Sequence, residues 1–273
     1  MNYRHAFHAG NFADVVKHLV LVACLLHLRK KEQPFAVIDT HAGRGRYDLE
    51  GDEASRTGEA ANGIGRLGGV TAEGALGEYL ALARGEIFYP GSPLLAAMLL
   101  RPSDRLVAIE KHAEDVAALK AALAAYPNAR AEQADGYARL TALLPPKERR
   151  GLIVIDPPYE APDEFAQAAA ALRGALRRFA TGIYLIWFPV KSAGEANAFA
   201  GELLNAGPKK ALRIDIDIGA APGAGDKERL AAAGLIVVNP PFGLAGEMEA
   251  ALAAVAPLLS PKARYSVSAL AGE

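Results

Sequence analysis

The chain has 273 residues, 51% of them apolar, and a formal net charge of -1 at pH 7. This length and composition are typical of a globular protein with a sizeable core, and the near-neutral charge argues against a protein that coats nucleic acid without specificity. The single cysteine, Cys24, excludes an internal disulfide. The N-terminus lacks signal-peptide architecture, and apolar runs such as 19–26 are too short to span a bilayer. We therefore expect a cytoplasmic protein without a membrane partner.

Positive charge is concentrated in three parts of the chain. Residues 1–47 contain seven Arg or Lys against three acids, and KERR (147–150) and RR (177–178) are further clusters. Each cluster fits either a local basic face or ordinary charged surface in contact with solvent.

Apolar runs typical of strands alternate with helical patterns along most of the chain. The predicted strands are FAVID (35–39), RLVAIE (105–110), ARAEQAD (129–135), LIVID (152–156), GIYLIWF (182–188), LRIDIDI (212–218) and LIVVN (235–239). The predicted helices cover 12–30, 92–100, 112–125, 163–178 and 193–205. This alternation predicts an α/β fold with a seven-stranded, mostly parallel sheet and helices on both faces. The connection before the last strand looks like a loop, so we expect that strand to be antiparallel.

One stretch interrupts the alternation. A βα unit reaches its next strand in about thirty residues, but RLVAIE follows FAVID at roughly twice that spacing. The intervening residues 48–88 are rich in Gly, Ala and Glu, with a short helical pattern at GALGEYLALAR. We therefore expect a core formed by 1–47 and 89–273, with 48–88 as an inserted, partly helical subdomain.

The first predicted strand leads into the glycine-containing segment DTHAGRGRY. In a parallel sheet, ligands bind beyond the carboxyl ends of the strands. Gly43 and Gly45 allow the backbone to turn tightly there and to approach a ligand, although such glycines also serve as simple turn residues. The segment lacks the GxGxxG spacing of dinucleotide-binding loops, which disfavours a nicotinamide cofactor.

The next two predicted strands each end in an acid. Glu110 is placed to accept hydrogen bonds from ribose hydroxyls, and Asp135, followed by Gly136, to accept them from an adenine amino group. Either acid alone could equally be a helix N-cap or a turn residue. With the glycine loop, and without a GxxxxGK[ST] phosphate loop, the two acids predict a ligand that contains adenosine.

The fourth predicted strand ends in Asp156-Pro157-Pro158-Tyr159. The exocyclic amine of adenine is a poor nucleophile because its lone pair is delocalised into the ring. Acceptors on its two N–H groups favour a pyramidal, more nucleophilic nitrogen, and the Asp156 carboxylate and the Pro157 carbonyl are suitable acceptors. Tyr159 offers a flat ring on which a base can stack. This motif therefore predicts chemistry on a planar amine.

A similar motif, NPPF, follows the last predicted strand at 239–242. By residue type Asn239 would serve nearly as well as Asp156. An antiparallel strand, however, ends at the opposite edge of the sheet. We therefore predict that DPPY is the working copy and that NPPF lies far from the ligand.

The glycine loop resembles the FxGxG loop of S-adenosylmethionine-dependent adenine methyltransferases, with His41 where Phe is usual. The segments YRHAFHAGNFADVVKH (3–18), YPGSPL (89–94) and RRGLIVIDPPYE (149–160) resemble the RlmJ-type 23S ribosomal RNA adenine-N6 methyltransferases, and the similarity runs from residue 2 to about 243. The resemblance implies a Rossmann-like methyltransferase core with a small helical insertion. It also implies S-adenosyl-L-methionine as cofactor and direct in-line methylation of N6 of one adenine in 23S rRNA, presented single-stranded or flipped.

The resemblance assigns roles by position. Asp156 is implied as the catalytic acceptor and as part of the cofactor site, and Tyr3 as the N-terminal aromatic residue that meets the RNA. His5, with Pro157 and Tyr159, is expected on the substrate side. The residues expected to line the cofactor site are Lys17, His18, His41, Gly43, Ser92, Glu110, Asp135 and Gly136.

Other readings remain open. The histidines at 5, 8, 18 and 41 could form a metal site, but no cysteine or carboxylate spacing accompanies them and methyl transfer requires no metal, so we expect none. The same acceptor geometry would suit a DNA adenine or a protein glutamine methyltransferase. A catalytically inactive adenosine- or RNA-binding protein is the non-enzymatic alternative. We expect a monomer.

Overall fold

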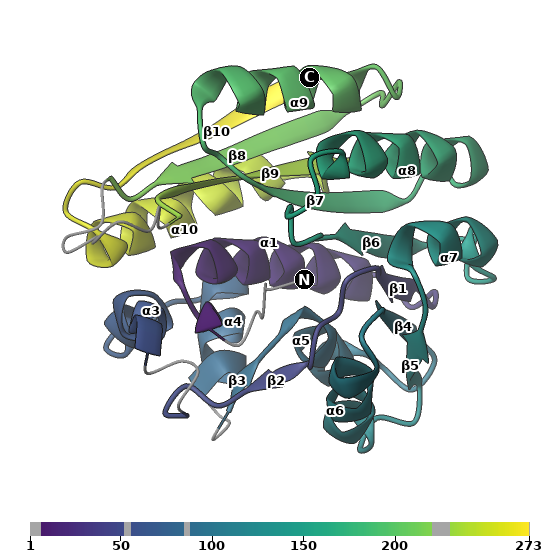
Figure 1. Ribbon diagram of the computed structural model, residues 1–273, viewed down its shortest axis with the longest axis horizontal. Coiled ribbons are helices and arrows are strands. Elements are labelled where there is room, and N and C mark those ends of the chain that lie inside the picture. The colour runs from purple at the N-terminus through teal and green to yellow at the C-terminus, as the bar shows by residue number, and fades with distance from the viewer. Residues whose placement is uncertain (1–6, 52–55, 85–87, 220–229, 273) are drawn as a thin grey trace.

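The computed structural model describes residues 7–51, 56–84, 88–219 and 230–272 (Figure 1). Its centre is an eight-stranded sheet of order β10-β8-β9-β7-β6-β1-β4-β5. The strands are β1 (Ala36–Asp39), β4 (Arg105–Glu110), β5 (Ala129–Gln133), β6 (Gly151–Ile155), β7 (Ile183–Pro189), β8 (Ala211–Asp217), β9 (Ala232–Val238) and β10 (Arg264–Ala271). Neighbouring strands from β5 to β7 are parallel, whereas β9 is antiparallel to both of its neighbours. The predicted α/β fold and the antiparallel LIVVN strand are thus confirmed.

The predicted number of strands is wrong, because β10 follows the seven expected strands. This strand pairs antiparallel with β8 at the edge of the sheet. Its sequence, RYSVSALA, mixes polar and small residues, and most of its side chains are exposed. An edge strand that buries so little lacks the apolar run by which the other strands were predicted.

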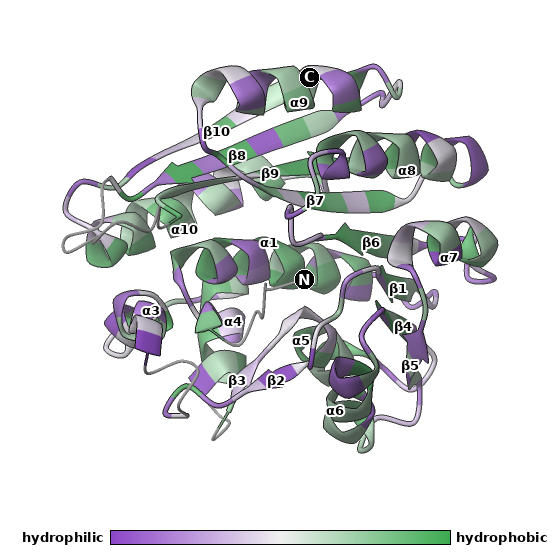
Figure 2. Cartoon of the chain, in the orientation of Figure 1, coloured by the Kyte–Doolittle hydropathy of each residue, from purple (hydrophilic) through white to green (hydrophobic). Residues whose placement is uncertain are grey.

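Helices cover both faces of the sheet (Figure 1). One face packs against α1 (Phe12–Arg29), α5 (Ser92–Leu99), α6 (Ala113–Leu123) and α10 (Leu244–Leu259), and the other against α7 (Gly136–Leu143), α8 (Glu164–Arg178) and α9 (Ala193–Leu204). Alternate side chains of the central strands enter the two cores: Val37 and Val154 lie on the first side, Ile38 and Ile155 on the second. Burial on both faces explains the unbroken apolar runs, which are green in Figure 2.

Helix α1 is largely enclosed by other elements of the fold. It lies between the sheet and α4 (Gly74–Arg84), and 15 of its 18 residues are buried. The side chain of Asn11 caps its first turn by accepting hydrogen bonds from the amides of Ala13 and Asp14. A helix that is apolar on nearly all sides belongs in a core. In the described part of the chain, no helix has the length and hydropathy needed to cross a membrane.

The segment 48–88 contains three short helical elements in its described part. These are α3 (Glu59–Asn62), the 3-10 helix η2 (Ile64–Leu67) and α4, and the antiparallel pair β2 (Arg46–Tyr47) and β3 (Tyr89–Pro90) joins the two ends of the segment. Apolar side chains from these helices pack against α1 in the same core as the sheet. The division of the chain into a core and an inserted subdomain remains a proposal.

Close packing at the start of β6 gives a test of the fold. A Cβ added to Gly151 would lie 2.4 Å from the carbonyl oxygen of Ala36, on the neighbouring central strand. We expect Gly151→Ala to lower the free energy of unfolding by about 1–3 kcal/mol, because neither backbone can move away easily. Gly174→Ala, on α8 with no atom within 4 Å of the added carbon, should raise it by up to about 1 kcal/mol. Urea denaturation measures both, and an unchanged Gly151→Ala would contradict the packing described.

Candidate active site

A cavity of about 1460 Å³ opens beyond the carboxyl ends of the parallel strands. Its walls include residues from the ends of β1, β4, β5, β6 and β7 and from the start of α1. Eleven of the thirteen site residues expected from sequence line it: Lys17, His18, His41, Gly43, Ser92, Glu110, Asp135, Gly136, Asp156, Pro157 and Tyr159. The other two, Tyr3 and His5, lie outside the described residues. The sequence therefore selected side chains that the fold brings into one cavity.

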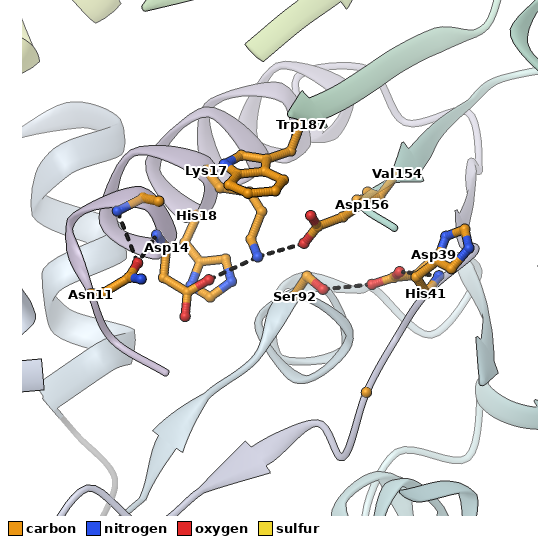
Figure 3. A network of polar contacts seen from close by, with 12 residues as sticks. Asn11, Asp14, Lys17, His18, Asp39, His41, Ser92, Val154, Asp156 and Trp187 are labelled. Atoms are coloured by element: carbon orange, nitrogen blue, oxygen red, sulfur yellow. Dashed lines mark hydrogen bonds and ion pairs between the residues drawn. The ribbon is translucent and has the colours of Figure 1, made fainter. Parts of the chain in front are cut away.

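A buried ion pair joins α1 to the end of β6 (Figure 3). The Nζ atom of Lys17 lies 2.6 Å from Oδ2 of Asp156 and 2.8 Å from Oδ1 of Asp14, and the Lys17 side chain is 5% exposed. Burial alone would lower the pKa of Lys17, but the two carboxylates outweigh it and raise this pKa well above 10.5. Lys17 therefore stays charged. Since it occupies Oδ2, Oδ1 of Asp156 remains available to a ligand.

The residues after Asp156 are held by an aromatic cluster. Tyr159 has a positive φ of 51°, and its hydroxyl donates a 2.7 Å hydrogen bond to the carbonyl oxygen of Trp187. Its ring packs against Phe165 at 4.6 Å between centroids and against Phe199 at 6.3 Å. The ring lines the cavity while its hydroxyl is engaged. Tyr159 therefore shapes the cavity wall and fixes the course of the DPPY segment.

The glycine loop and the acid of the second strand are bonded to each other. Glu110 accepts hydrogen bonds from the amide of Gly43 at 3.0 Å with one carboxylate oxygen, and from the amides of Lys111 and His112 at 2.7 and 2.9 Å with the other. These bonds fix the carboxylate at the cavity wall. Gly43 has a φ of 60°, and an added Cβ would lie 2.4 Å from the Tyr47 hydroxyl. This turn therefore requires glycine.

Asp135 and Gly136 lie at the end of β5, where α7 begins. Asp135 is the N-cap of α7 and accepts a 3.1 Å hydrogen bond from the amide of Ala138, and its other oxygen lies 3.2 Å from Nζ of Lys111. The N-cap interpretation of Asp135 thus holds, and the same side chain lines the cavity. A Cβ on Gly136 would lie 2.0 Å from the carbonyl oxygen of Thr40. This close approach places the start of α7 against the end of β1.

Two histidines line the cavity wall, His18 buried and His41 half-buried. Nδ1 of His41 lies 2.8 Å from Oγ1 of Thr40, and burial lowers the pKa of His41 to about 4, so its imidazole is neutral at pH 7. Nδ1 of His18 lies 2.8 Å from the Tyr89 hydroxyl, which in turn lies 3.0 Å from that of Tyr79. Within the ranges that the structure describes, no group of three or more potential metal ligands is present.

The second proline motif lies at the amino ends of the parallel strands, opposite the cavity. The Asn239 side chain donates to the carbonyl oxygens of Ala180 and Gly182, which precede β7, at 2.9 and 2.7 Å. Asn239 is absent from the cavity wall, and Phe242 is 97% exposed. Asn239 lies away from the cavity because β9 runs antiparallel to β7 and β8, so that the end of β9 lies beside the amino ends of these two strands.

Comparison with known proteins identifies the family of this chain. The family model described as "Ribosomal RNA large subunit methyltransferase D, RlmJ" matches residues 32–269. The chain belongs to this family. It is similar to the proteins named "Ribosomal RNA large subunit methyltransferase J" of Escherichia coli, at 40% identity with 91% of this chain and 90% of that protein covered, and of Haemophilus influenzae, at 38% identity with 96% and 95% covered. A crystal structure of a Legionella pneumophila protein superposes with a TM-score of 0.86 at 31% identity, covering 96% of this chain and 98% of that one.

The sequence analysis of this RlmJ-family protein missed four residues that lie in or beside the cavity. Asp14 faces Lys17 three residues along α1, a spacing that predicts contact on one helix face. Asp39 is the last residue of β1, where the rule used for Glu110 applies equally, and Trp187 lies two residues before the end of β7. Tyr137 lies beside His41, with ring centroids 4.8 Å apart. The hydroxyl of Tyr137 and the indole N–H of Trp187 are buried without a hydrogen-bond partner among the residues that the structure describes.

Asp39 and His41 titrate over the same pH range with opposite effects on stability. Burial raises the pKa of Asp39 to about 6, although Ser92 donates a 2.7 Å hydrogen bond to it. The folded protein therefore binds this proton more tightly than the unfolded chain, and stability falls as pH rises from about 4 to about 6. The lowered pKa of His41 has the opposite sign, so that stability rises with pH through its value of about 4 towards 6.5.

Asp39→Asn isolates the first effect. Relative to the wild type, its free energy of unfolding should rise by on the order of 2 kcal/mol between pH 4 and pH 7, because the variant has no carboxylate to ionise in the core. Urea denaturation at several pH values gives this difference. Asp163→Asn, at an exposed position before α8, should follow the wild-type profile. A parallel profile for Asp39→Asn would mean that Asp39 ionises as freely in the folded protein as in the unfolded chain.

Proposed function

We propose that this protein is an S-adenosyl-L-methionine-dependent methyltransferase that modifies the exocyclic N6 amine of one adenine in 23S rRNA by direct in-line transfer. The observation that carries the proposal is the shared cavity: Asp156 and Pro157 line it together with Gly43, Glu110 and Asp135. An acceptor site for a planar amine thus faces the strand ends that suit an adenosine-containing cofactor. Family membership and the names of the relatives support ribosomal RNA as the substrate. We place the action of the enzyme in the cytoplasm, because that is where a bacterial ribosomal RNA is found.

The cavity wall fits the proposed cofactor. Glu110 offers a fixed carboxylate for ribose hydroxyls, and the tight turn at Gly43 brings backbone close to a ligand. The neutral ring of His41 adds no positive charge next to a sulfonium. The buried Tyr137 hydroxyl, which has no partner, can serve an adenine ring nitrogen. When bound, the cofactor supplies the electrophilic methyl group.

The protein's own part in the reaction is to hold the amine. Oδ1 of Asp156 and the carbonyl oxygen of Pro157 accept its two N–H groups, which localises the nitrogen lone pair for attack. The bond from Lys17 to Oδ2 keeps the carboxylate oriented, and Asp14 holds Lys17 in place. After transfer, Asp156 assists loss of the amine proton. Most of the acceleration comes from holding the two reactants together.

An adenine inside a duplex cannot reach this carboxylate. RNA bases that undergo chemistry are single-stranded or flipped out of the stack. A binding site for one small molecule usually has a volume of several hundred cubic ångströms. The cavity is larger than this, so it can hold a cofactor and one extruded base. DNA adenine and protein glutamine remain rival substrates on amine geometry alone, and an inactive adenosine-binding protein is the non-enzymatic rival.

Replacing Asp156 tests the role of the acceptor. Asp156→Ala is expected to reduce single-turnover methyl transfer to rRNA by about 10²–10⁴-fold, because the amine loses an acceptor and a route for its proton. Binding of S-adenosyl-L-methionine, measured by calorimetry, should remain. Asp163→Ala, at an exposed position before α8, is the matched carboxylate control and should transfer at the wild-type rate.

Labelled cofactor separates the rivals. Transfer to naked rRNA, and not to duplex DNA or protein, is the expected pattern for the wild type. Full turnover by Asp156→Ala would refute the acceptor role, and a wild type that binds cofactor without any transfer would support the inactive binding protein.

A further inference from the structure

The cavity itself is poorly suited to attract an RNA backbone. Its wall contains eight Asp and Glu residues against four Lys and Arg residues. Phosphates supply most of the electrostatic affinity of nucleic-acid binding, and they are repelled by such a surface. The chain as a whole carries a charge of -1. An RNA-modifying enzyme of this composition therefore needs its positive charge concentrated elsewhere.

The amino ends of the parallel strands, opposite the cavity, have this charge. Lys30 and Lys31 follow α1 and lead to β1, and Lys147 and Arg149 precede β6, the neighbour of β1. All four side chains are exposed and have no ion-pair partner among the described residues. This positive charge affects the neighbouring His27. Its pKa is lowered by burial and then by the charges of Lys30, Arg150 and Lys31, while Glu247 has the opposite effect.

The same edge continues with two more exposed pairs. Arg177 and Arg178 end α8 before β7, and Lys209 and Lys210 precede β8. Here too no carboxylate partner is present in the described part of the chain. We call these four pairs, before β1, β6, β7 and β8, the basic edge. Glu32 is the exposed acid in the loop before β1, so the balance of exposed charge is strongly positive.

Hydrogen bonds tie these loops into one surface. The Arg150 guanidinium donates to the carbonyl oxygens of Gln33 and Leu28, which joins the loop before β6 to that before β1. At the other end, the amide of Asn239 donates to the carbonyl oxygen of Lys210, and its side chain donates to that of Gly182. With strands about 4.8 Å apart, the four spacings from β1 across β6, β7 and β9 to β8 give the edge a length of roughly 19 Å.

An exposed aromatic ring lies in this surface. Phe242 is 97% exposed, and the turn that carries it is held by the bonds of Asn239 to the loops before β7 and β8. Basic residues interleaved with an aromatic ring are the signature of a surface that binds a nucleic-acid backbone and stacks an unpaired base. The second proline motif thus has a use that is separate from chemistry.

We propose that the basic edge is a second RNA-binding surface, which holds the phosphodiester backbone of the substrate RNA at a segment remote from the methylated adenine. This proposal rests on the proposed function, because the RNA bound at the basic edge is the same RNA that is methylated in the cavity. The two surfaces are separated by the length of the strands, about 17–23 Å for five to seven residues. A short oligonucleotide fills the cavity alone, whereas a large folded rRNA segment reaches both surfaces. Affinity is supplied by the edge and the reaction by the cavity.

Charge neutralisation at the edge tests the proposal. The edge variant carries Lys147→Gln, Arg177→Gln, Arg178→Gln and Lys210→Gln. The control variant removes the same charge at exposed positions elsewhere, through Lys120→Gln, Arg173→Gln, Lys262→Gln and Arg264→Gln. Each is compared with the wild type for methylation of a large 23S rRNA fragment and of a short single-stranded oligonucleotide that contains the target adenine. Direct binding of the fragment is measured at several salt concentrations.

For the edge variant we expect the KM for the large fragment to rise at least tenfold, while kcat stays within twofold of the wild-type value. The slope of log K for binding against log salt concentration should fall by up to about 3, because each lost phosphate contact contributes about 0.7–0.9. The KM for the short oligonucleotide should be unchanged. Phe242→Ala should weaken binding of the large fragment about fivefold or more. The control variant should match the wild type throughout.

An edge variant that matches the control in KM, fragment binding and salt slope would overturn the proposal. The same result is expected if the basic edge binds an acidic protein instead of RNA. Failure of the proposed function gives a different result. In that case the wild type transfers no methyl group to either RNA, while binding of the large fragment still reports on the edge.

Discussion

A single lysine links the N-terminal helix α1 to the end of β6. Lys17 is buried on α1 and shared by Asp14 of the same helix and Asp156 at the end of β6. A buried ammonium is stable only where carboxylates compensate for its lost hydration, and removing one partner of such a group typically costs about 3–5 kcal/mol. The pair therefore fixes α1 against the cavity. It also orients the carboxylate whose free oxygen is proposed to accept the amine.

Strand direction decides which groups can meet that carboxylate. The parallel strands β1, β4, β5, β6 and β7 deliver the glycine turn, the two acids and the DPPY segment to one edge of the sheet. The antiparallel β9 delivers a motif of nearly the same composition to the opposite edge. Two similar sequences thus acquire different environments from topology alone. One faces an acidic cavity, and the other lies among exposed cations.

Much of this was readable from sequence because buried parallel strands are continuous apolar runs and their last residues mark the ligand edge. The same rule, applied to every strand end, would also have found Asp39, the last residue of β1. The strand β10 could not be found in this way, since an exposed edge strand carries no apolar pattern. The partnership of Lys17 with Asp156 spans 139 residues, and no local pattern encodes it. The anchoring of Glu110 by three backbone amides likewise depends on how separate loops meet.

We propose that chemistry and RNA affinity lie at opposite ends of the strands of one sheet, with the amine held at Asp156. The most direct test is a crystal structure of the protein with S-adenosyl-L-homocysteine and adenosine monophosphate. We predict the nucleotide amine within hydrogen-bonding distance of Asp156 Oδ1 and the Pro157 carbonyl oxygen, with the cofactor product against Glu110 and the Gly43 turn. Binding of either ligand outside this cavity, or an amine directed away from Asp156, would contradict the account.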